Sequence, residues 1–456
     1  MNTKQIRQTI LDLAIRGELV PQDPTDEPAS VLLERIRAEK EQLIKDKKLK
    51  REKKDSQPID EAPFELPEGW VWCRLGDLLI NRDGERKPLS SSVRSKQIKK
   101  KYDYYGATGV IDKVDNYIFD EKLLLVGEDG ANLLSKVKPN AFFAEGKYWV
   151  NNHAHILDAT NKNLLDYVII VINTISLDNY ITGTAQPKLS QENLNKIPIP
   201  LPPLAEQYRI LQKVEQLLTI VDAIEQLQEQ LKALIKQTKN QVLNYAIAGK
   251  LTHQDPNDEP AEELLKRIGK TTATDTPYEK LPKGWAWCRL GDIGEIIGGG
   301  TPSTSIEEYW NGEISWITPA DLSNYSDKYI AQGKRNITQL GLDNSSAKLI
   351  PKGSILFSTR APIGYVVIAD RPLSTNQGFK SLSLSINMSE EFVYYFLLAE
   401  KERIKLLASG TTFQELSASA FSKILIPLPP LAEQHRIVQQ IETFFASFDQ
   451  IEKELA

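Results

Sequence analysis

Apolar residues recur at alternating spacings of four and three along the segment that follows Pro202 and Pro203. Such a heptad pattern indicates a helix that buries one stripe against a partner helix, so we predict a coiled-coil seam. Proline suits the start of a helix and glycine suits its left-handed end, so Pro203 and Gly249 delimit one helix over about 204–248. At about 1.5 Å per residue, this helix is roughly 65 Å long. The predicted seam residues on it are Ile210, Val214, Leu217, Val221, Ile224, Leu231 and Ile235.

The same pattern returns at the end of the chain and continues at its beginning. The N-terminal residues Ile6, Ile10 and Leu13 have the spacing of one further stretch of this seam. A rod that separates two globular units accounts for the length and regularity of the pattern, while two ordinary helices in one core are the alternative. The C-terminal seam residues are Ile437, Ile441, Phe444, Phe448 and Ile451.

Three pairs of segments repeat along the chain. LPEGWVWCRLGDL matches LPKGWAWCRLGDI at 10 of 13 positions, and IPLPPLAEQYRI matches IPLPPLAEQHRI at 11 of 12. A 23-residue stretch from Ala14 matches the stretch from Ala246 at 15 positions. The repeats identify an internal duplication. Because the offset between copies is 232 at the N-terminal end and 227 at the C-terminal end, the two ends supply complementary pieces of one repeat. This predicts a two-copy ring that is opened inside a helix.

Two segments of unlike sequence, about 79–196 and 294–423, lie between the repeated pieces. Each contains short β-rich runs broken by turn residues, and then one apolar helical stretch before the repeated IPLPPL. A constant frame with two different inserts suits a protein that presents two separate recognition surfaces. Divergence by drift, without distinct roles for the inserts, is the alternative.

Composition narrows the class of protein. The 456 residues are 41% apolar and 26% charged, which is near the average for soluble globular proteins. The N-terminus has no continuous apolar stretch of the kind found in signal peptides, and two cysteines fit a reducing compartment, so we expect a cytoplasmic location. The net charge of −5 excludes a polycation that coats nucleic acid. The two recognition segments are nearly neutral, so we expect weak DNA binding by the isolated chain and a phosphate grip supplied by partners.

Motifs of catalysis are missing from the sequence. It contains no GxxxxGK[ST] phosphate loop, no HExxH zinc motif and no GxSxG nucleophile elbow. Cys73 and Cys288 are equivalent repeat positions, which we interpret as core residues because two lone thiols do not make a structural zinc site. His153 and His155 lie two residues apart without an acidic neighbour in sequence, so a structural or ligand-contacting role is favoured over a metal. We therefore predict a protein that is not an enzyme and holds no metal.

A basic run beside aromatic residues, KQIKKKYDYYG, is the clearest sign of nucleic-acid chemistry. Lysine and arginine neutralise phosphates, and aromatic rings can lie against sugar or base. A solvated charged loop is the alternative.

Several motifs resemble the specificity subunit of type I restriction-modification systems. They are the duplicated IPLPPLAEQ before a long helix and the first-insert sequences YYGATGVIDKVDNYIFD, GEDGA and GKYWVNNHAHIL. The second insert is similar to another common version in that family, with GGGTPSTSIEEYWNGEISWITPADL, FSTRAPIG and TNQGF. The resemblance covers nearly the whole chain. It implies that each insert is a target-recognition domain that reads one half of a bipartite double-stranded DNA sequence.

The resemblance also implies a fold and a set of partners. The fold is mixed α/β (α+β), with two β-rich target-recognition domains separated by two long antiparallel coiled-coil helices, a pseudo-twofold duplication and a circular organisation. The helices set the unread spacer between the half-sites. Two methyltransferase subunits dock on this frame and bring S-adenosylmethionine for adenine methylation, and restriction subunits bring ATP and Mg, so that this chain has no cofactor of its own.

The implied organisation divides the chain into five segments. They are an N-terminal helical segment and charged linker (1–65), the first target-recognition domain (66–201), the central long helix and linker (202–280), the second target-recognition domain (281–428) and the C-terminal helix (429–456).

Base readers are usually Asn, Gln, Arg and Lys, and residue type and loop position suggest candidates for DNA contact. In the first domain we predict Lys99, Lys101, Tyr104, Tyr105, Asn132, Asn151, Asn152 and His153. In the second we predict Thr301, Ser303, Thr304, Arg360, Asn376, Gln377 and Lys380. A loop common to both domains adds Thr184, Gln186 and Lys188, and Thr411, Thr412 and Gln414. Two other classes stay open, a free-standing methyltransferase or nuclease and a scaffold whose inserts bind proteins rather than DNA.

Overall fold

The computed structural model describes residues 2–50, 59, 62–183, 185–275, 280–360, 362–385, 388–409 and 414–455. The chain forms two compact units, Met1–Leu227 (unit 1) and Gln228–Ala456 (unit 2). The predicted long helix is present as α8 (Leu204–Ile247), which contributes to both units. Gly249 follows it with φ +66°, the left-handed conformation that glycine adopts without strain.

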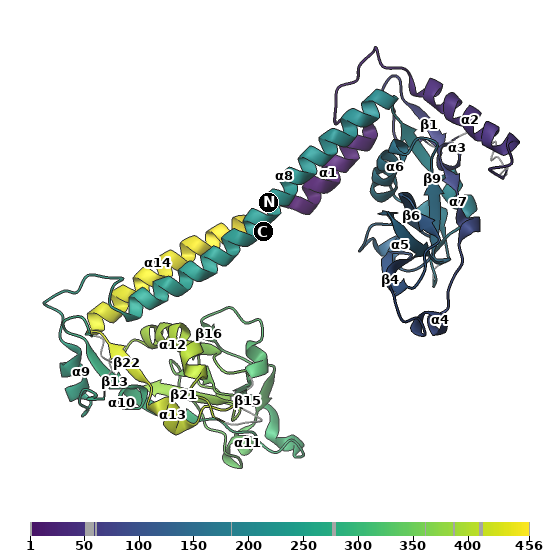
Figure 1. Ribbon diagram of the computed structural model, residues 1–456. Coiled ribbons are helices and arrows are strands. Elements are labelled where there is room, and N and C mark those ends of the chain that lie inside the picture. Colours follow the sequence, from purple (N-terminus) through teal and green to yellow (C-terminus); the bar gives the residue numbers. More distant parts are fainter. Residues whose placement is uncertain are drawn as a thin grey trace. The chain divides into compact units, whose positions relative to one another are not determined.

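Unit 1 has a frame built from the repeated pieces and from the last two helices of its insert. Helix α1 (Thr3–Arg16) lies along α8 (Figure 1). Arg7 near its start pairs with Asp222 and Glu225, and Gln22 beyond its end donates to Glu206, so α1 runs antiparallel to α8. The other frame elements of this unit are α2 (Ala29–Lys45), β1 (Val71–Arg74), α3 (Leu75–Leu78), α6 (Asn163–Thr174), α7 (Gln191–Lys196) and β12 (Pro198–Leu201).

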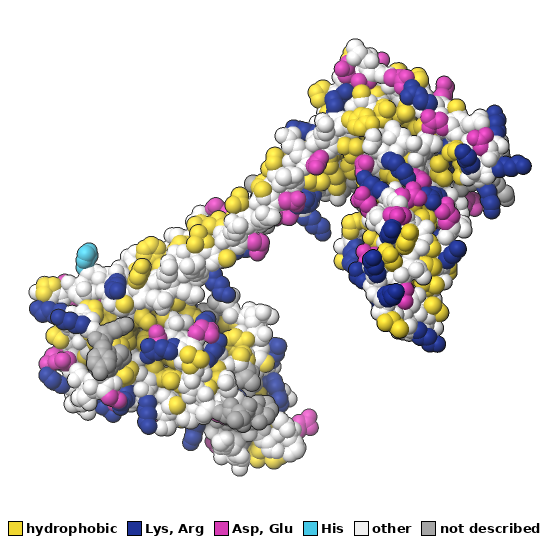
Figure 2. All heavy atoms as spheres, viewed as in Figure 1, with side chains coloured by type: hydrophobic (Ala, Val, Ile, Leu, Met, Phe, Trp, Pro, Cys, Tyr) yellow, Lys and Arg dark blue, Asp and Glu magenta, His cyan; other side chains and the backbone are white. Residues whose placement is uncertain are grey.

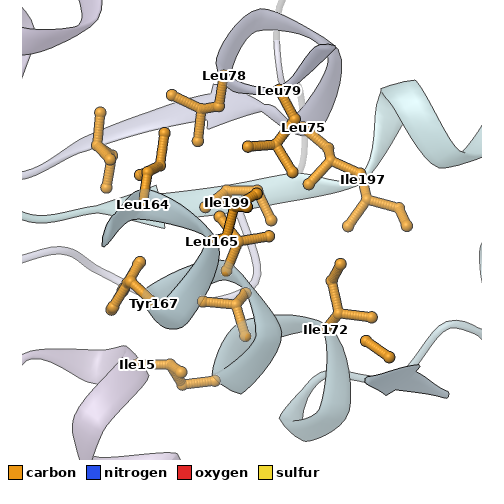
Figure 3. Close-up of a cluster of buried hydrophobic side chains, with 14 of the residues drawn as sticks. Ile15, Leu75, Leu78, Leu79, Leu164, Leu165, Tyr167, Ile172, Ile197 and Ile199 are labelled. Carbon is orange, nitrogen blue, oxygen red and sulfur yellow. The ribbon is translucent and has the colours of Figure 1, made fainter. Parts of the chain in front are cut away.

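The core of unit 1 forms where these frame elements meet. β1 and β12 pair antiparallel, with Cys73 opposite Ile199, although the two strands are far apart in sequence. Apolar side chains from α3, α6 and β12 converge beside this ladder (Figure 3). Tyr167 is fully buried there and donates its hydroxyl to the carbonyl of Pro200 at 2.6 Å. Both cysteines of the chain are free and buried, as expected for core residues.

Unit 2 repeats this frame with α14 in the place that α8 takes in unit 1. Helix α14 (Leu431–Leu455) packs beside the second part of α8, where Lys239 pairs with Asp449 and Glu452. β13 and β22 pair with Cys288 opposite Ile426. The other frame elements are α9 (Ala261–Arg267), β13 (Ala286–Arg289), α10 (Leu290–Ile293), α12 (Glu390–Lys405), α13 (Ala418–Ser422) and β22 (Leu425–Leu428).

The predicted seam residues differ in burial. Along α8 and α14 the buried ones are Ile210, Val214, Val221, Ile235, Ile437 and Ile441, and the partly buried ones are Leu217, Ile224, Leu231 and Phe448. Phe444 is 37% exposed, because its neighbour Phe445 points to the domain and packs edge-on against Tyr395 of α12. Ile451 is 40% exposed in the last turns of α14, where the polar Gln228 side chain donates to the carbonyl of Leu455. Phe444 and Ile451 are therefore the two predicted seam residues that are exposed.

The two inserts share one strand order although their sequences differ. In unit 1 the main sheet has the order β2-β9-β6-β7, and in unit 2 it has the order β14-β21-β18-β19-β16. All pairs are antiparallel except β16·β19, so unit 2 has the same four strands and one addition. The strands are β2 (Ile80–Asn81), β6 (Leu123–Gly127), β7 (Ala141–Ala144), β9 (Ala154–Asp158), β14 (Gly294–Gly298), β16 (Tyr329–Ile330), β18 (Ile355–Ser358), β19 (Val366–Ala369) and β21 (Phe379–Leu384).

A second sheet accompanies the main sheet in each unit. Its orders are β4-β3-β8-β5 in unit 1 and β17-β15-β20 in unit 2. The pairs β3·β8 and β15·β20 are both parallel, so the strand that leads into β9 or β21 is held in the same way. The strands are β3 (Tyr102–Gly106), β4 (Gly109–Val114), β5 (Phe119–Asp120), β8 (Lys147–Val150), β15 (Trp310–Ile317), β17 (Arg335–Ile337) and β20 (Ser374–Thr375). Within the described residues, no helix is both long and apolar enough to cross a membrane.

Candidate nucleic-acid interface

Loops from four separate segments of unit 1 meet at one end of its sheets. The Asn151 backbone N–H donates to the Tyr105 carbonyl at 3.0 Å, which joins the end of β8 to the end of β3. The Glu128 N–H, after β6, donates to the His153 carbonyl at 2.9 Å. The Leu189 N–H in turn donates to the Glu128 carbonyl at 2.8 Å. We call this set of loops, residues 105–109, 127–131, 150–154 and 185–189, loop cluster 1.

Charged side chains brace loop cluster 1 from within. Arg86 donates to the Glu128 carboxylate at 2.6 Å and to the Ala154 carbonyl at 2.9 Å. Lys188 pairs with the other Glu128 oxygen at 3.3 Å. These bonds offset the desolvation that opposes ionisation and hold the pKa of Glu128 below its usual value. Arg86 and Lys188 therefore hold the loops of the cluster together through Glu128.

His155, the second residue of β9, is fully buried beneath this cluster. Its Nδ1 lies 2.6 Å from an Asp83 oxygen and its Nε2 lies 2.8 Å from the Leu189 carbonyl oxygen. Both neighbours accept hydrogen bonds, so each ring nitrogen faces an acceptor. Burial opposes ionisation of Asp83, but the bond from His155 and that from the Ile156 N–H hold its pKa below the usual value. Polar atoms of Asp83, Glu128 and His155 lie within 4.8 Å of one another. Within this group His155 Nδ1 lies 2.6 Å from an Asp83 oxygen and 4.0 Å from a Glu128 oxygen.

Unit 2 builds loop cluster 2 in the same place. The Asn376 N–H, after β20, donates to the Ile317 carbonyl at the end of β15. The Thr359 N–H, after β18, donates to the Gly378 carbonyl at 2.7 Å, and the Leu416 N–H donates to the Thr359 carbonyl. Loop cluster 2 consists of residues 299–301, 317–318, 359–360, 375–380 and 414–416.

One contact in each loop cluster joins an acidic residue to a basic residue, and the two residues occupy opposite positions in the two units. Isolated β-bridges join Asp129 to Lys188 in unit 1 and Arg360 to Glu415 in unit 2. The strand registers make Asp129 equivalent to Arg360, and the common loop makes Lys188 equivalent to Glu415. An acid and a base have thus exchanged places in a contact that both units contain. Glu415 lies 4.0 Å from the Arg360 guanidinium and also 3.7 Å from Lys380 Nζ.

Many of the predicted DNA-contacting residues fall in the two loop clusters. In unit 1 these are Tyr105, Asn151, Asn152, His153, Gln186 and Lys188, and in unit 2 they are Thr301, Arg360, Asn376, Gln377, Lys380 and Gln414. The exposed ones are Asn152, His153, Gln186, Lys188, Thr301, Gln377 and Gln414. Thr184, Thr411 and Thr412 lie outside the described residues.

Other predicted residues lie elsewhere or have a structural role. Tyr104 is 1% exposed, and its hydroxyl bonds the Leu89 backbone while Arg94 covers its ring, so it is unavailable to DNA. Asn132 donates to the Lys138 carbonyl and to Asn140, which orders the loop after α5 (Asn132–Ser135). Burial argues against DNA contact by Tyr104, whereas the half-buried Asn132 has a structural role and its DNA contact stays a prediction.

The remaining predicted residues are lysines and hydroxyl-bearing residues that lie outside the loop clusters. Lys99 is exposed before β3, and Lys101 covers the ring of Tyr102 at 5.4 Å, at the opposite end of β3 from Tyr105. Ser303 and Thr304 are exposed in the loop after β14, where the Ser303 carbonyl accepts from the Trp310 indole. In the view of Figure 2, basic and acidic side chains are interspersed over unit 1, in keeping with the nearly neutral insert.

Sequence reasoning missed the residues that brace the clusters. Arg86, Glu128, Asp129 and Glu415 belong to no recognisable motif, and the partners named above lie between 24 and 68 residues away. His153 also has an acidic partner that was not expected, since its Nδ1 lies 2.8 Å from an Asp129 oxygen. The single available signal was the GEDGA sequence, which places two acids directly after an apolar strand.

The fold and the two loop clusters define a duplicated recognition protein, with one polar loop surface in each unit. Comparison with known proteins agrees with this class. The type I restriction modification DNA specificity domain matches residues 67–233 and 282–456, and the chain belongs to this family. It is a specificity subunit of the type I restriction-modification kind, and this class of subunit is non-catalytic.

Relatives extend along the whole chain. The type I restriction enzyme EcoEI specificity subunit of Escherichia coli is 28% identical over 99% of this chain and 90% of its own length. The MjaIX specificity subunit of Methanocaldococcus jannaschii is 44% identical, over 41% of this chain and 43% of its own length. The crystal structure of the HsdS subunit from Thermoanaerobacter tengcongensis has a TM-score of 0.54 at 19% identity, and covers 87% of this chain and 94% of that one, a likeness of fold.

Proposed function

We propose that loop clusters 1 and 2 each contact one half of a bipartite double-stranded DNA target. The observation that carries the proposal is the recurrence of the same loop cluster at equivalent positions of both units. Two inserts that diverged in sequence but kept one loop arrangement are suited to reading two different half-sites. The candidates for contact are the exposed members of the two clusters, Ser303 and Thr304 at the margin of loop cluster 2, and Lys99 and Lys101 at the other end of β3.

We propose that the helices form an antiparallel coiled coil within a circularly organised frame, and that they set the spacer between the half-sites. Contacts that repeat at the sequence offsets support the circular organisation. Arg7 with Asp222 corresponds to Lys239 with Asp449, at offsets of 232 and 227. One partner in each pair comes from α8, and the chain ends supply the others.

A second repeated contact joins the helix to the frame in both units. The Trp70 indole donates to the buried Glu206 carboxylate at 2.9 Å, and the Trp285 indole donates to Glu433 at the same distance. These pairs support the proposed boundaries at residues 65, 201, 280 and 428, because the conserved contacts lie where frame and insert join.

We further propose that two methyltransferase subunits dock on this frame, and that restriction subunits complete the assembly. Adenine methylation with S-adenosylmethionine, and DNA cleavage with ATP and Mg, then belong to those partners. The near-neutral inserts support a division of labour in which partners supply much of the phosphate contact. The cytoplasmic location expected from cysteine usage fits the two free buried thiols.

The test is to co-express the chain with the methyltransferase subunit encoded beside it and to map modified adenines by single-molecule sequencing. A gapped motif with two unlike half-sites is the expected result. A stable complex that leaves the DNA unmodified would contradict the proposal and favour the scaffold alternative. A salt-dependent DNA footprint of the assembled complex separates these alternatives independently, because a scaffold whose inserts bind proteins leaves none.

A further inference from the structure

The same turn stands at the tip of each loop cluster. In unit 1 the Asn151 side-chain oxygen accepts from the His153 N–H at 2.8 Å. In unit 2 the Asn376 side-chain oxygen accepts from the Gly378 N–H at 3.0 Å. This is an Asx turn, in which asparagine replaces a backbone carbonyl and fixes the two residues after it. The sequences around the turns, VNNHA and TNQGF, share one asparagine, so the turn is visible only in the structure.

Strand registers show that the two turns are equivalent. Ala154 pairs with Gly127 at the start of β9, and Phe379 pairs with Ser358 at the start of β21. Counting back from these pairs, Asn151 corresponds to Asn376 and Asn152 corresponds to Gln377. Asn151 and Asn376 form the turns. The residue after each, Asn152 or Gln377, is exposed at the tip of the turn.

Neighbouring side chains hold each tip residue. The Thr301 hydroxyl donates to Gln377 Oε1 at 2.5 Å, which orients the amide and leaves its NH2 group and one oxygen lone pair available to a ligand. In unit 1 Arg86, which follows β2, reaches the Asn152 carbonyl at 3.4 Å and the Ala154 carbonyl beside it. Each tip amide is therefore carried on a braced turn rather than on a free loop. Such preorganisation lowers the conformational entropy lost on binding.

We propose that Asn152 and Gln377 are the specificity-determining residues of their half-sites, and that each reads an adenine edge with its carboxamide. Asparagine and glutamine pair with adenine through two hydrogen bonds in the major groove, accepting from N6 and donating to N7. Asn151 and Asn376 are positioning residues, since their side chains are used by the turn. This inference rests on the proposed DNA reading and names its readers.

The experiment uses the complex of the full chain with its methyltransferase subunit, with the modified motif as readout. Asn152→Ala is expected to relax one position of one half-site, to leave the other half-site intact, and to slow methylation of the original site by about 5- to 150-fold. Gln377→Ala is expected to do the same in the other half-site only. Asn116→Ala and Gln332→Ala, which alter exposed amides outside the loop clusters, are the matched controls and should leave the motif unchanged.

The positioning role has its own test. Asn376→Ala removes the turn acceptor and should slow methylation through the second half-site without relaxing any base. Asn376→Asp keeps an oxygen at that position and should restore the rate. Unchanged base preference in both Asn152→Ala and Gln377→Ala, or relaxation of both half-sites by either variant, would overturn the inference while the bipartite motif of the unaltered complex still stands. Absence of a bipartite motif from the unaltered complex would instead refute the proposed function.

Discussion

Replacing Gly17 with alanine should separate α1 from the frame of unit 1. Gly17 ends α1 with φ +74°, and a Cβ built on it would lie 2.5 Å from Pro67 Cγ and 2.9 Å from the Trp70 ring. The left-handed backbone costs alanine about 1–2 kcal/mol. Overpacking against the proline and the indole adds about 1–3 kcal/mol. The sum of about 2–5 kcal/mol corresponds to about 30- to 4,000-fold more frequent local opening.

Hydrogen exchange measures this effect locally, without assuming that the chain unfolds in one transition. Protection of the α1 amides should fall by that factor in Gly17→Ala. Gly146→Ala is the matched control, because Gly146 has φ +73° in the same unit and an added Cβ meets nothing within 4 Å. It should weaken protection around the turn between β7 and β8 by the backbone cost alone, about 1–2 kcal/mol.

The same comparison is available in unit 2. Gly249, with φ +66°, faces Pro282 and Trp285 as Gly17 faces Pro67 and Trp70. Gly269, with φ +73° and open space around it, is its control. Equal losses of protection in Gly17→Ala and Gly146→Ala would refute the steric argument and leave backbone conformation as the whole cause.

Four further outcomes are expected. Inserting residues into α8 near Gln228 should change the spacer of the methylated motif and leave both half-sites unaltered, and full-rate methylation of the original site would count against the ruler. Glu415→Lys places like charges beside Arg360 and should slow methylation through the second half-site up to about fivefold, with recovery in the Glu415→Lys/Arg360→Glu double variant, since such exposed pairs contribute about 0–1 kcal/mol. Burial raises the pKa of Glu206 despite its bond from Trp70, so its stabilising contribution is present below pH 4.5 and is lost as the pH rises through its folded pKa. In urea unfolding, Glu206→Gln should therefore lose less stability than the native chain over that rise in pH. An equal loss in the two proteins would contradict this. The purified chain alone should bind DNA weakly in a fluorescence titration, and tight, salt-sensitive binding would refute the assigned role of the partners.

The pH argument for Glu206 follows from its place in the fold. Its carboxylate is 1% exposed, so the charged form loses more hydration than the indole and amide donors around it return. Glutamine keeps an oxygen that can accept from the Trp70 indole but has no charge to desolvate. The difference between the two proteins therefore isolates the ionisation, and the other carboxyl groups cancel in the comparison.

The amino-acid sequence by itself determined the duplication, the long helix and the class of protein. The duplication is a property of the letters, and the helix follows from local rules. Heptad spacing, the prolines before Leu204 and the glycine after Ala248 act within a few residues of the positions that they specify. The motifs that carry the family resemblance, such as the duplicated IPLPPLAEQ, are also local patterns, so the class of protein could be assigned before its fold was known.

Only the tertiary structure decided that the two unlike inserts share one strand order. Strand pairing joins residues far apart in sequence, and different side chains can satisfy the same register. For the same reason, the roles of neighbouring residues were set by the fold. Asn151 closes a turn while Asn152 is exposed, and Tyr104 is buried while Tyr105, one pleat further on, faces the other side of the sheet. Residue type suggested each of these four for DNA contact, but burial and hydrogen bonding come from partners on other strands, which no local pattern records.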